Sequence, residues 1–205
     1  MSMSLRVIVP PHPIIGHWLA MLRNPSTPKA LYGTGLEQLG KWLTYEALRD
    51  WLPNRKEEIL TSNGKAEGIV IESKIPILSV PNIPGGIQMW QGARDVLPNA
   101  TLCLGGVPTE IEDNSGIIFY LDQITTGSQL IKDIDYLQEL EIDPQRIRVI
   151  TSLASSIGLK NIGERFKDLN IFCACIDPEL LTEDEMSPGI GNPTLRINTR
   201  VRGRN

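Results

Sequence analysis

The segment that most constrains the fold of this chain is Ile117–Leu130, with the sequence IIFYLDQITTGSQL. Its first five residues are continuously apolar and of high strand propensity, which is the pattern of a parallel strand covered on both faces. An acid, Asp122, follows at the carboxyl end, and small polar residues then precede a helix predicted to run to about Leu140. This order predicts a buried strand that passes through a tight turn into a helix.

The turn after this strand carries donor groups at the start of the predicted helix. Backbone N–H groups at a helix start lack partners, and the positive end of the helix dipole favours an anion. In open α/β sheets, ligands bind at the carboxyl ends of the strands. An ordinary strand–helix turn capped by a threonine explains the same residues equally well. The candidate phosphate-binding residues are Thr125, Thr126, Gly127, Ser128 and Gln129.

The composition is that of a globular protein with one sizeable core. The chain has 205 residues, of which 41% are hydrophobic and 21% charged, so a single domain over residues 1–205 is expected. The net charge of −4 argues against general nucleic-acid binding. The end of the chain is locally basic, and we interpret residues 200–205 as a flexible end or docking arm.

Cysteine usage indicates a reducing compartment. The chain has three cysteines, an odd number, and they lack the spacing of metal ligands. We therefore expect a cytoplasmic protein with free thiols. There is no long apolar segment and no signal-peptide pattern at the start, so neither secretion nor a membrane span is expected. The cysteines are Cys103, Cys173 and Cys175.

Residues 1–53 are predicted to be a mainly helical N-terminal part. Apolar residues at helical spacing predict one helix over 14–24 and a long amphipathic helix over 36–53, separated by a linker rich in proline and glycine. The two histidines lack an acid or cysteine partner, so we expect them to be structural, with His12 as a cap or turn residue. Aromatic residues at helical spacing are expected to pack in the core, namely Trp18, Trp42, Tyr45 and Trp51.

Residues 69–177 are predicted to form an α/β core. Strand patterns alternate with helix patterns through this part, which predicts a twisted, mainly parallel sheet with helices on both faces. Helices are expected over 86–98, after the turn at Ser128 and around 162–169. The predicted strands are 67–73, 74–80, 99–107, 117–121, 145–154 and 170–177.

With these elements in order, the chain resembles the uracil phosphoribosyltransferases nearly from end to end. The resemblance rests on ordered segments at 9–28, 45–53, 96–100, 134–140, 176–179 and 188–191. It implies the type I phosphoribosyltransferase α/β fold, which is usually dimeric. The reaction implied joins uracil to phosphoribosyl pyrophosphate (PRPP) with magnesium, giving UMP and pyrophosphate.

The resemblance also places the sites of such an enzyme on this sequence. The acid expected to hold the ribose hydroxyls or magnesium falls on Leu121, and Asp122 stands one residue later. The phosphate loop survives in part at 126–129. Main-chain groups of Met186 and Gly191, in a hood segment over 178–199, are the implied uracil contacts.

Other family positions depart from the pattern at the pyrophosphate end. The Arg-Ala-Gly loop of the family corresponds to Pro84, Gly85 and Gly86, so an arginine is missing and a proline removes a backbone donor. The flexible arm that closes over the substrate is shortened to the segment 110–115, and the early Phe-Arg pair becomes residues 32–33.

These departures favour loss of UMP-forming catalysis. We expect a protein-binding subunit or a nucleotide or phosphate sensor, because the departures gather at the loops that serve catalysis. The alternative is an active uracil phosphoribosyltransferase that would need magnesium; a phosphoribosyltransferase for another base is a third, weaker hypothesis. No cofactor is otherwise expected. The ligands and partners to test are uracil, UMP, PRPP, a second copy of the chain and another protein.

Overall fold

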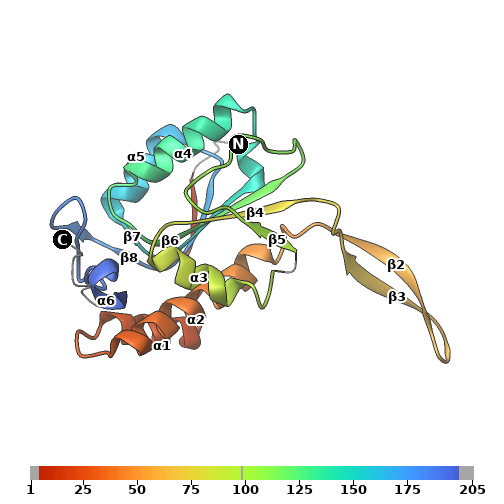
Figure 1. Ribbon diagram of the computed structural model, residues 1–205, viewed down its shortest axis with the longest axis horizontal. Coiled ribbons are helices and arrows are strands. Elements are labelled where there is room, and N and C mark those ends of the chain that lie inside the picture. The colour runs from red at the N-terminus through yellow and green to blue at the C-terminus, as the bar shows by residue number, and fades with distance from the viewer. Residues whose placement is uncertain (1–4, 98, 199–205) are drawn as a thin grey trace, which may run out of the picture.

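The computed structural model describes residues 5–97 and 99–198 and has a six-stranded sheet at its centre (Figure 1). Every neighbouring pair in this sheet is parallel, which confirms the predicted α/β class. Across the sheet, the strands are β1 (Arg6–Ile8), β8 (Asn170–Asp177), β7 (Ile147–Ser155), β6 (Gly116–Ile124), β4 (Ile77–Pro81) and β5 (Ala100–Leu102).

Helices cover both faces of the sheet, as the sequence predicts (Figure 1). Side chains of the predicted central strand, β6, alternate between two hydrophobic cores, with Ile118 and Tyr120 in one and Ile117 and Phe119 in the other. One face carries α4 (Ser128–Glu139) and α5 (Ser156–Arg165), and the other carries α1 (Pro13–Arg23), α2 (Lys29–Leu48) and α3 (Gly85–Ala93).

Helix α2 begins earlier than predicted, within the segment interpreted as a linker. Two of its glycines allow close packing, because a Cβ at Gly35 would lie 2.8 Å from Leu22 of α1 and a Cβ at Gly40 would collide with the carbonyl of Met89 in α3. Close helix packing therefore outweighs the turn preference of glycine. Helix α5 likewise begins earlier than predicted, at the capping residue Ser155.

Residues 54–71 form an antiparallel hairpin that projects from the body (Figure 1). Its strands are β2 (Asn54–Thr61) and β3 (Gly64–Ile71). The strand predicted over 67–73 is confirmed in part as β3, but it pairs with β2 and does not join the core sheet; the prediction was wrong at 54–61, which was interpreted as a polar stretch. Cross-strand ion pairs join Lys56 to Glu67 and Lys65 to Glu58, at 2.8 and 2.7 Å.

The hood consists of β9 (Glu179–Leu180), β10 (Met186–Ser187) and α6 (Pro193–Ile197), and hydrogen bonds join it to α1 and to the end of β8. Arg23 Nη2 lies 2.6 Å from Asp177 Oδ1, and Arg23 Nη1 donates to the carbonyl of Gly189 at 3.0 Å. Asp177 Oδ2 also accepts the amide of Gly189 at 2.8 Å. This network positions the hood against the N-terminal helix. The predicted basic tail, 200–205, lies outside the described residues.

Smaller predictions have mixed outcomes. His12 is confirmed as a helix cap, since its Nδ1 accepts the amide of Ile14 at 3.2 Å. Tyr45, predicted to pack, is instead 54% exposed. Cys173 is buried and Cys175 is partly exposed. The segment 103–115 between β5 and β6 has no helix or strand, and no helix within the described ranges is long and apolar enough to cross a bilayer.

Candidate functional site

A cavity of about 230 Å³ lies at the carboxyl end of β6, around the predicted phosphate turn. We call the turn, residues 125–129, the cradle. All five cradle residues line the cavity, so the structure brings this group of predicted residues together. The rest of the lining comes from the loop after β4, the end of β6, the start of α4 and the hood, namely Asn82, Leu121, Gln123, Ile124, Leu130, Glu183 and Asp184.

The cradle presents the open start of α4 to this cavity. Gly127, the residue before the helix, has φ +76°, a conformation that favours glycine, and it supplies no side-chain cap. The first helical bond links Ile131 N to Gly127 O at 2.9 Å, so the preceding amides lack helical partners. Ser128 N is 3.4 Å from Thr126 Oγ1, at the long limit of a hydrogen bond. This geometry favours the anion-binding interpretation over a threonine cap.

Contacts from α5 fix the orientation of the cradle. Ser155 Oγ donates to the carbonyl of Thr125, and Asn161 Nδ2 donates to the carbonyl of Thr126 at 3.1 Å. A Cβ at Gly158 would collide with the Thr125 carbonyl, so glycine is required there for this approach. The sequence prediction missed these residues, although the small residues at the start of α5 were a signal. Because the carbonyls bond to α5, the amides are left for a ligand.

The part of the cavity lining that comes from the hood, the acidic wall, has two carboxylates. It carries Glu183 and Asp184 of the hood, and Gln123 Nε2 donates to the carbonyl of Asp184 at 3.1 Å. None of the residues that line the cavity is lysine or arginine. The cradle amides therefore suit an anion, whereas the carboxylates of Glu183 and Asp184 suit hydroxyl or amino donors of a ligand. These two acids were not predicted as site residues, because only the fold brings them to the cradle.

Asp122 lies on the opposite face of β6 from the cavity, in a hydrogen-bond network with Asn82. Its carboxylate accepts from Asn82 Nδ2 at 2.9 Å, and Asn82 Oδ1 accepts the amides of Gly86 and Asp122 at 2.8 and 3.2 Å. Burial raises the pKa of Asp122, although the hydrogen bond from Asn82 opposes this. The side chain at the cavity is that of Leu121. This position does not favour the predicted ribose or magnesium role of Asp122.

The predicted pyrophosphate loop is closed onto this same network. Pro84 has no N–H, the amide of Gly86 is bonded to Asn82, and the amide of Gly85 interacts with the Asp122 carboxylate. A Cβ at Gly85 or Gly86 would collide with Asp122 or with the carbonyl of Tyr120. The two glycines therefore allow β6 and α3 to approach, and their amides are already engaged.

The predicted uracil contacts lie in the hood but do not line the cradle cavity. Met186 is 6% exposed and pairs with Leu180 of β9. Gly191 has φ +71°, and the carbonyl of Ile190 before it accepts from Arg196 Nη1 at 3.0 Å. The hood is thus held by internal bonds at this turn.

Magnesium, which the family reaction implies, has few suitable ligands here. Within residues 5–97 and 99–198, no group of three or more histidine, cysteine, aspartate or glutamate side chains is placed to hold a metal ion. At the cavity, the carboxylates are those of Glu183 and Asp184, and the strand-end position presents Leu121. These residues do not fit a magnesium site built on the strand-end acid.

Comparison with known proteins agrees with this fold and these motifs. A family model described as uracil phosphoribosyltransferase matches residues 9–197. The chain belongs to the uracil phosphoribosyltransferase family. The resemblance inferred from the ordered motifs is therefore confirmed.

Relatives in this family cover nearly the whole chain. The uracil phosphoribosyltransferase of Nostoc sp. is 30% identical, over 96% of this chain and 99% of its own length. The chloroplastic uracil phosphoribosyltransferase of Arabidopsis thaliana is 31% identical, over 93% of this chain and 70% of its own length. A solved structure of an Aquifex aeolicus protein, 24% identical, has a TM-score of 0.80 over 93% of this chain and 97% of that one, which supports the fold.

Proposed function

We propose that this member of the uracil phosphoribosyltransferase family does not form UMP and instead binds a small phosphate monoester at the cradle, as a sensor. One observation carries the proposal. The polar groups of the pyrophosphate loop are engaged with Asn82 and Asp122, whereas the amides at the start of α4 are open to the cavity. The part of the site that would hold the leaving group is closed, and the part that would hold a phosphate is open.

The electrostatics support loss of catalysis. Departure of pyrophosphate develops negative charge, and an enzyme must stabilise that charge with donors or cations placed in advance. The lining of the cradle cavity has two carboxylates and no cationic side chain. Since removal of one such donor typically slows a reaction by about a hundred- to a thousand-fold, absence of the whole set leaves little rate.

The cavity also limits the ligand. Small-molecule pockets are usually about 300 to 1,000 Å³, so a cavity of about 230 Å³ suits a compact ligand. The cradle would hold a phosphate, and the acidic wall would accept hydrogen bonds from hydroxyl groups. Ribose 5-phosphate has both features, and UMP tests whether a base is tolerated.

The alternative function is UMP synthesis, which the names of the relatives favour. The deciding experiment mixes uracil, PRPP and magnesium with the purified, folded protein at high concentration, beside an active family enzyme. No UMP is expected. Clear turnover would overturn the proposed loss of catalysis.

Ligand binding is tested by thermal shift with ribose 5-phosphate and UMP, since a ligand that binds only the folded state raises its stability. We expect a rise in the wild type that is clearly smaller in the cradle variant Thr126→Val/Ser128→Ala. The matched control, Thr101→Val/Ser73→Ala, changes two exposed residues outside the cavity and should keep the shift. Equal shifts in both variants, or none in the wild type, would contradict the sensor.

A protein-binding subunit is the second candidate, and exposed apolar residues near the shortened arm favour it. Ile83 is 67% exposed and Leu104 is 61% exposed, and both adjoin a second cavity lined by Ile83 and Gly105. If two copies associate through this patch, Ile83→Asp/Leu104→Asp should convert a dimer to a monomer in sedimentation. A wild-type monomer would argue against self-association here.

A further inference from the structure

A second cleft, of about 430 Å³, lies at the amino ends of β1, β7 and β8. This is the edge of the sheet opposite the cradle, because the cradle follows the carboxyl end of β6 and all these strands are parallel. Nothing in the proposed function uses this cleft. Most of its lining residues are charged or polar, and they include Arg6, Arg148, Lys167, Asp50, Asp168 and Asn170.

The sheet register places two of its arginines in one row. Arg6 of β1 and Arg148 of β7 both pair with Asn170 of β8, so the three residues lie at the same level on adjacent strands. Residues at one level of a parallel sheet point to the same face, and adjacent strands are about 4.8 Å apart. The two arginine Cα atoms are therefore about 10 Å apart, and their long side chains reach into one cleft. Like charges placed this way repel unless an anion lies between them.

Arg148 is buried without a counter-ion. It is 9% exposed, its guanidinium lies 5.1 Å above the ring of Trp51, and Nη1 donates to the carbonyls of Gln145 and Ile147 at 3.0 Å each. Nε has no hydrogen-bond partner among the described residues. Within this part of the chain, no carboxylate lies within 4 Å of Arg148, Arg6 or Lys167.

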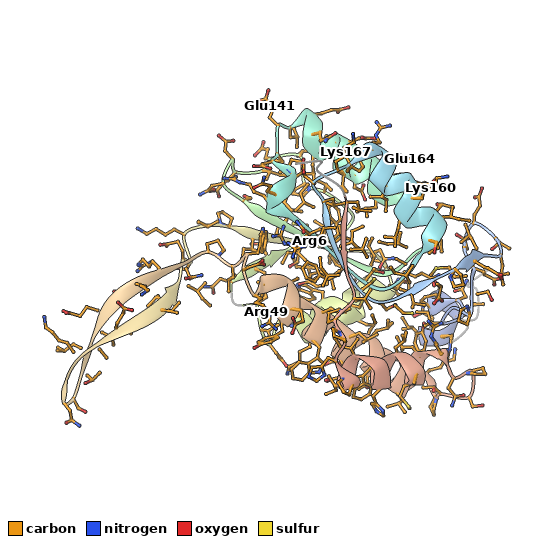
Figure 2. All side chains as sticks on the ribbon, turned by 180° about the vertical axis from the view of Figure 1, so that it is seen from behind. Arg6, Arg49, Glu141, Lys160, Glu164 and Lys167 are labelled. Carbon is orange, nitrogen blue, oxygen red and sulfur yellow. The ribbon has the colours of Figure 1, made fainter. Side chains whose placement is uncertain are left out.

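The charge of Arg148 is destabilised by these surroundings. Its pKa is lowered to about 10, mainly by burial; Asp50 acts in the opposite direction without forming an ion pair, and the charge of Arg6 contributes to the lowering. A buried cation without a paired anion costs free energy, and a bound anion relieves that cost. Arg6 and Lys167 are exposed at the rim, where Figure 2 labels them, and can approach such an anion.

We propose that this cleft binds the phosphate group of a small hydroxylated phosphate monoester, held among Arg6, Arg148 and Lys167. Asp50 and Asp168 also line the cleft, leaving it a formal charge of +1 from three cations and two acids. Carboxylates repel a phosphate but accept hydrogen bonds from hydroxyl groups, which defines the other end of the ligand. A volume of about 430 Å³ accommodates a ligand larger than inorganic phosphate.

The experiment is isothermal titration calorimetry of the full chain with inorganic phosphate, ribose 5-phosphate and UMP. In Arg6→Gln/Lys167→Gln, loss of two charge-assisted contacts should weaken one binding event about tenfold or more. The single-charge control Lys160→Gln lies on α5 outside this cleft (Figure 2) and should titrate like the wild type. The cradle variant Thr126→Val/Ser128→Ala should keep this event, which separates the cleft from the proposed sensor site.

Equal affinity in wild type and Arg6→Gln/Lys167→Gln would overturn the proposal, as would the absence of binding by every probe at millimolar concentration. Tighter binding of ribose 5-phosphate than of inorganic phosphate would support hydrogen bonds from the sugar hydroxyls to Asp50 and Asp168. A second variant, Arg148→Met, retains a long side chain over Trp51 and removes the buried charge. Its melting temperature should rise less with phosphate than that of the wild type, and a rise equal to that of the wild type would contradict the proposal. If Arg148→Met fails to fold, the variant Arg6→Gln/Lys167→Gln still tests the proposal, because it changes only exposed residues.

Discussion

At the scale of single residues, the side chain of Asn82 joins the two sides of the closed loop. It donates to the carboxylate of Asp122 and accepts amides from Gly86 and Asp122, so one side chain satisfies three polar groups at once. Asp122 is 7% exposed and cannot rely on water for hydrogen bonds. The loop after β4 therefore depends on the amide side chain of Asn82 for its hydrogen bonding.

Replacing Asn82 by alanine should destabilise the protein by about 1 to 3 kcal/mol, because buried polar partners lose their hydrogen bonds. Urea unfolding at pH 7 measures this change. The control Asn63→Ala alters an exposed turn in the hairpin and should have little effect. Equal stability of the two variants would show that the network does not hold the loop.

A second residue-scale prediction concerns Arg23. Its replacement by methionine leaves Asp177 buried and unpaired, which should cost roughly 2 to 3 kcal/mol, less than for a fully buried pair because the Arg23 side chain keeps 23% of its exposure. The comparison is Arg49→Met, which breaks a surface pair with Glu46 and should change the melting temperature little. Similar losses in both would contradict the special role of Arg23.

At the scale of elements, the hairpin 54–71 is separate from both hydrophobic cores. All residues of β2 are exposed, and apolar side chains such as Leu60 and Ile69 are 80% and 73% exposed. At its base, Glu72 N donates to the carbonyl of Pro53 at 2.9 Å, so the chain enters and leaves at adjacent points. The body of the protein therefore has no packing that requires the hairpin.

Replacement of residues 54–71 by a short Gly-Ser link should leave a folded body whose melting temperature lies within a few degrees of the wild type. Circular dichroism and thermal melting test this. Limited proteolysis of the intact chain should also cut first inside the hairpin, since local stability is lowest there. Loss of folding on excision would mean that the hairpin supports the core.

The elements that could be predicted from sequence are those in which the order of apolar and polar residues indicates which side chains are buried. Strands β6, β7 and β8 appear as apolar runs because both of their faces are covered. Strand β2 could not be found this way, because it is charged and exposed and pairs through side chains on β3. The cradle was predictable from a local motif. Asn82, Glu183 and Asp184 were not, because only tertiary folding brings them to the site.

At the scale of the whole molecule, the pair Arg23–Asp177 joins α1, the end of β8 and the hood. Burial disfavours the ionised Asp177, but the hydrogen bonds from Arg23 and from the amide of Gly189, together with the charge of Arg23, outweigh this and lower the pKa of Asp177 overall. A carboxyl whose pKa is lowered by folding stabilises the protein above its usual pKa near 4. That contribution is lost as the pH falls through the lower, folded pKa.

The stability difference between wild type and Asp177→Asn should therefore be largest near neutral pH and should shrink below about pH 4. Urea unfolding at several pH values between 3 and 7 measures it. The raised pKa of Asp122 lowers the stability of the folded state at neutral pH, which is opposite to the effect of Asp177. Since Asp122 is present in both proteins, the difference in stability between wild type and Asp177→Asn isolates the contribution of Asp177. The exposed control Asp113→Asn should differ from wild type by little at any pH.

The closed network around Asn82 has a consequence for protein engineering. An arginine introduced at position 84 would add a positive charge, but the amide of Gly86 would still be bonded to Asn82 and that of Gly85 would still face Asp122. Changing Asn82 or Asp122 alone would leave buried groups without partners. An anion site built into this loop would therefore need coordinated substitutions at several positions, and a single mutation would not suffice.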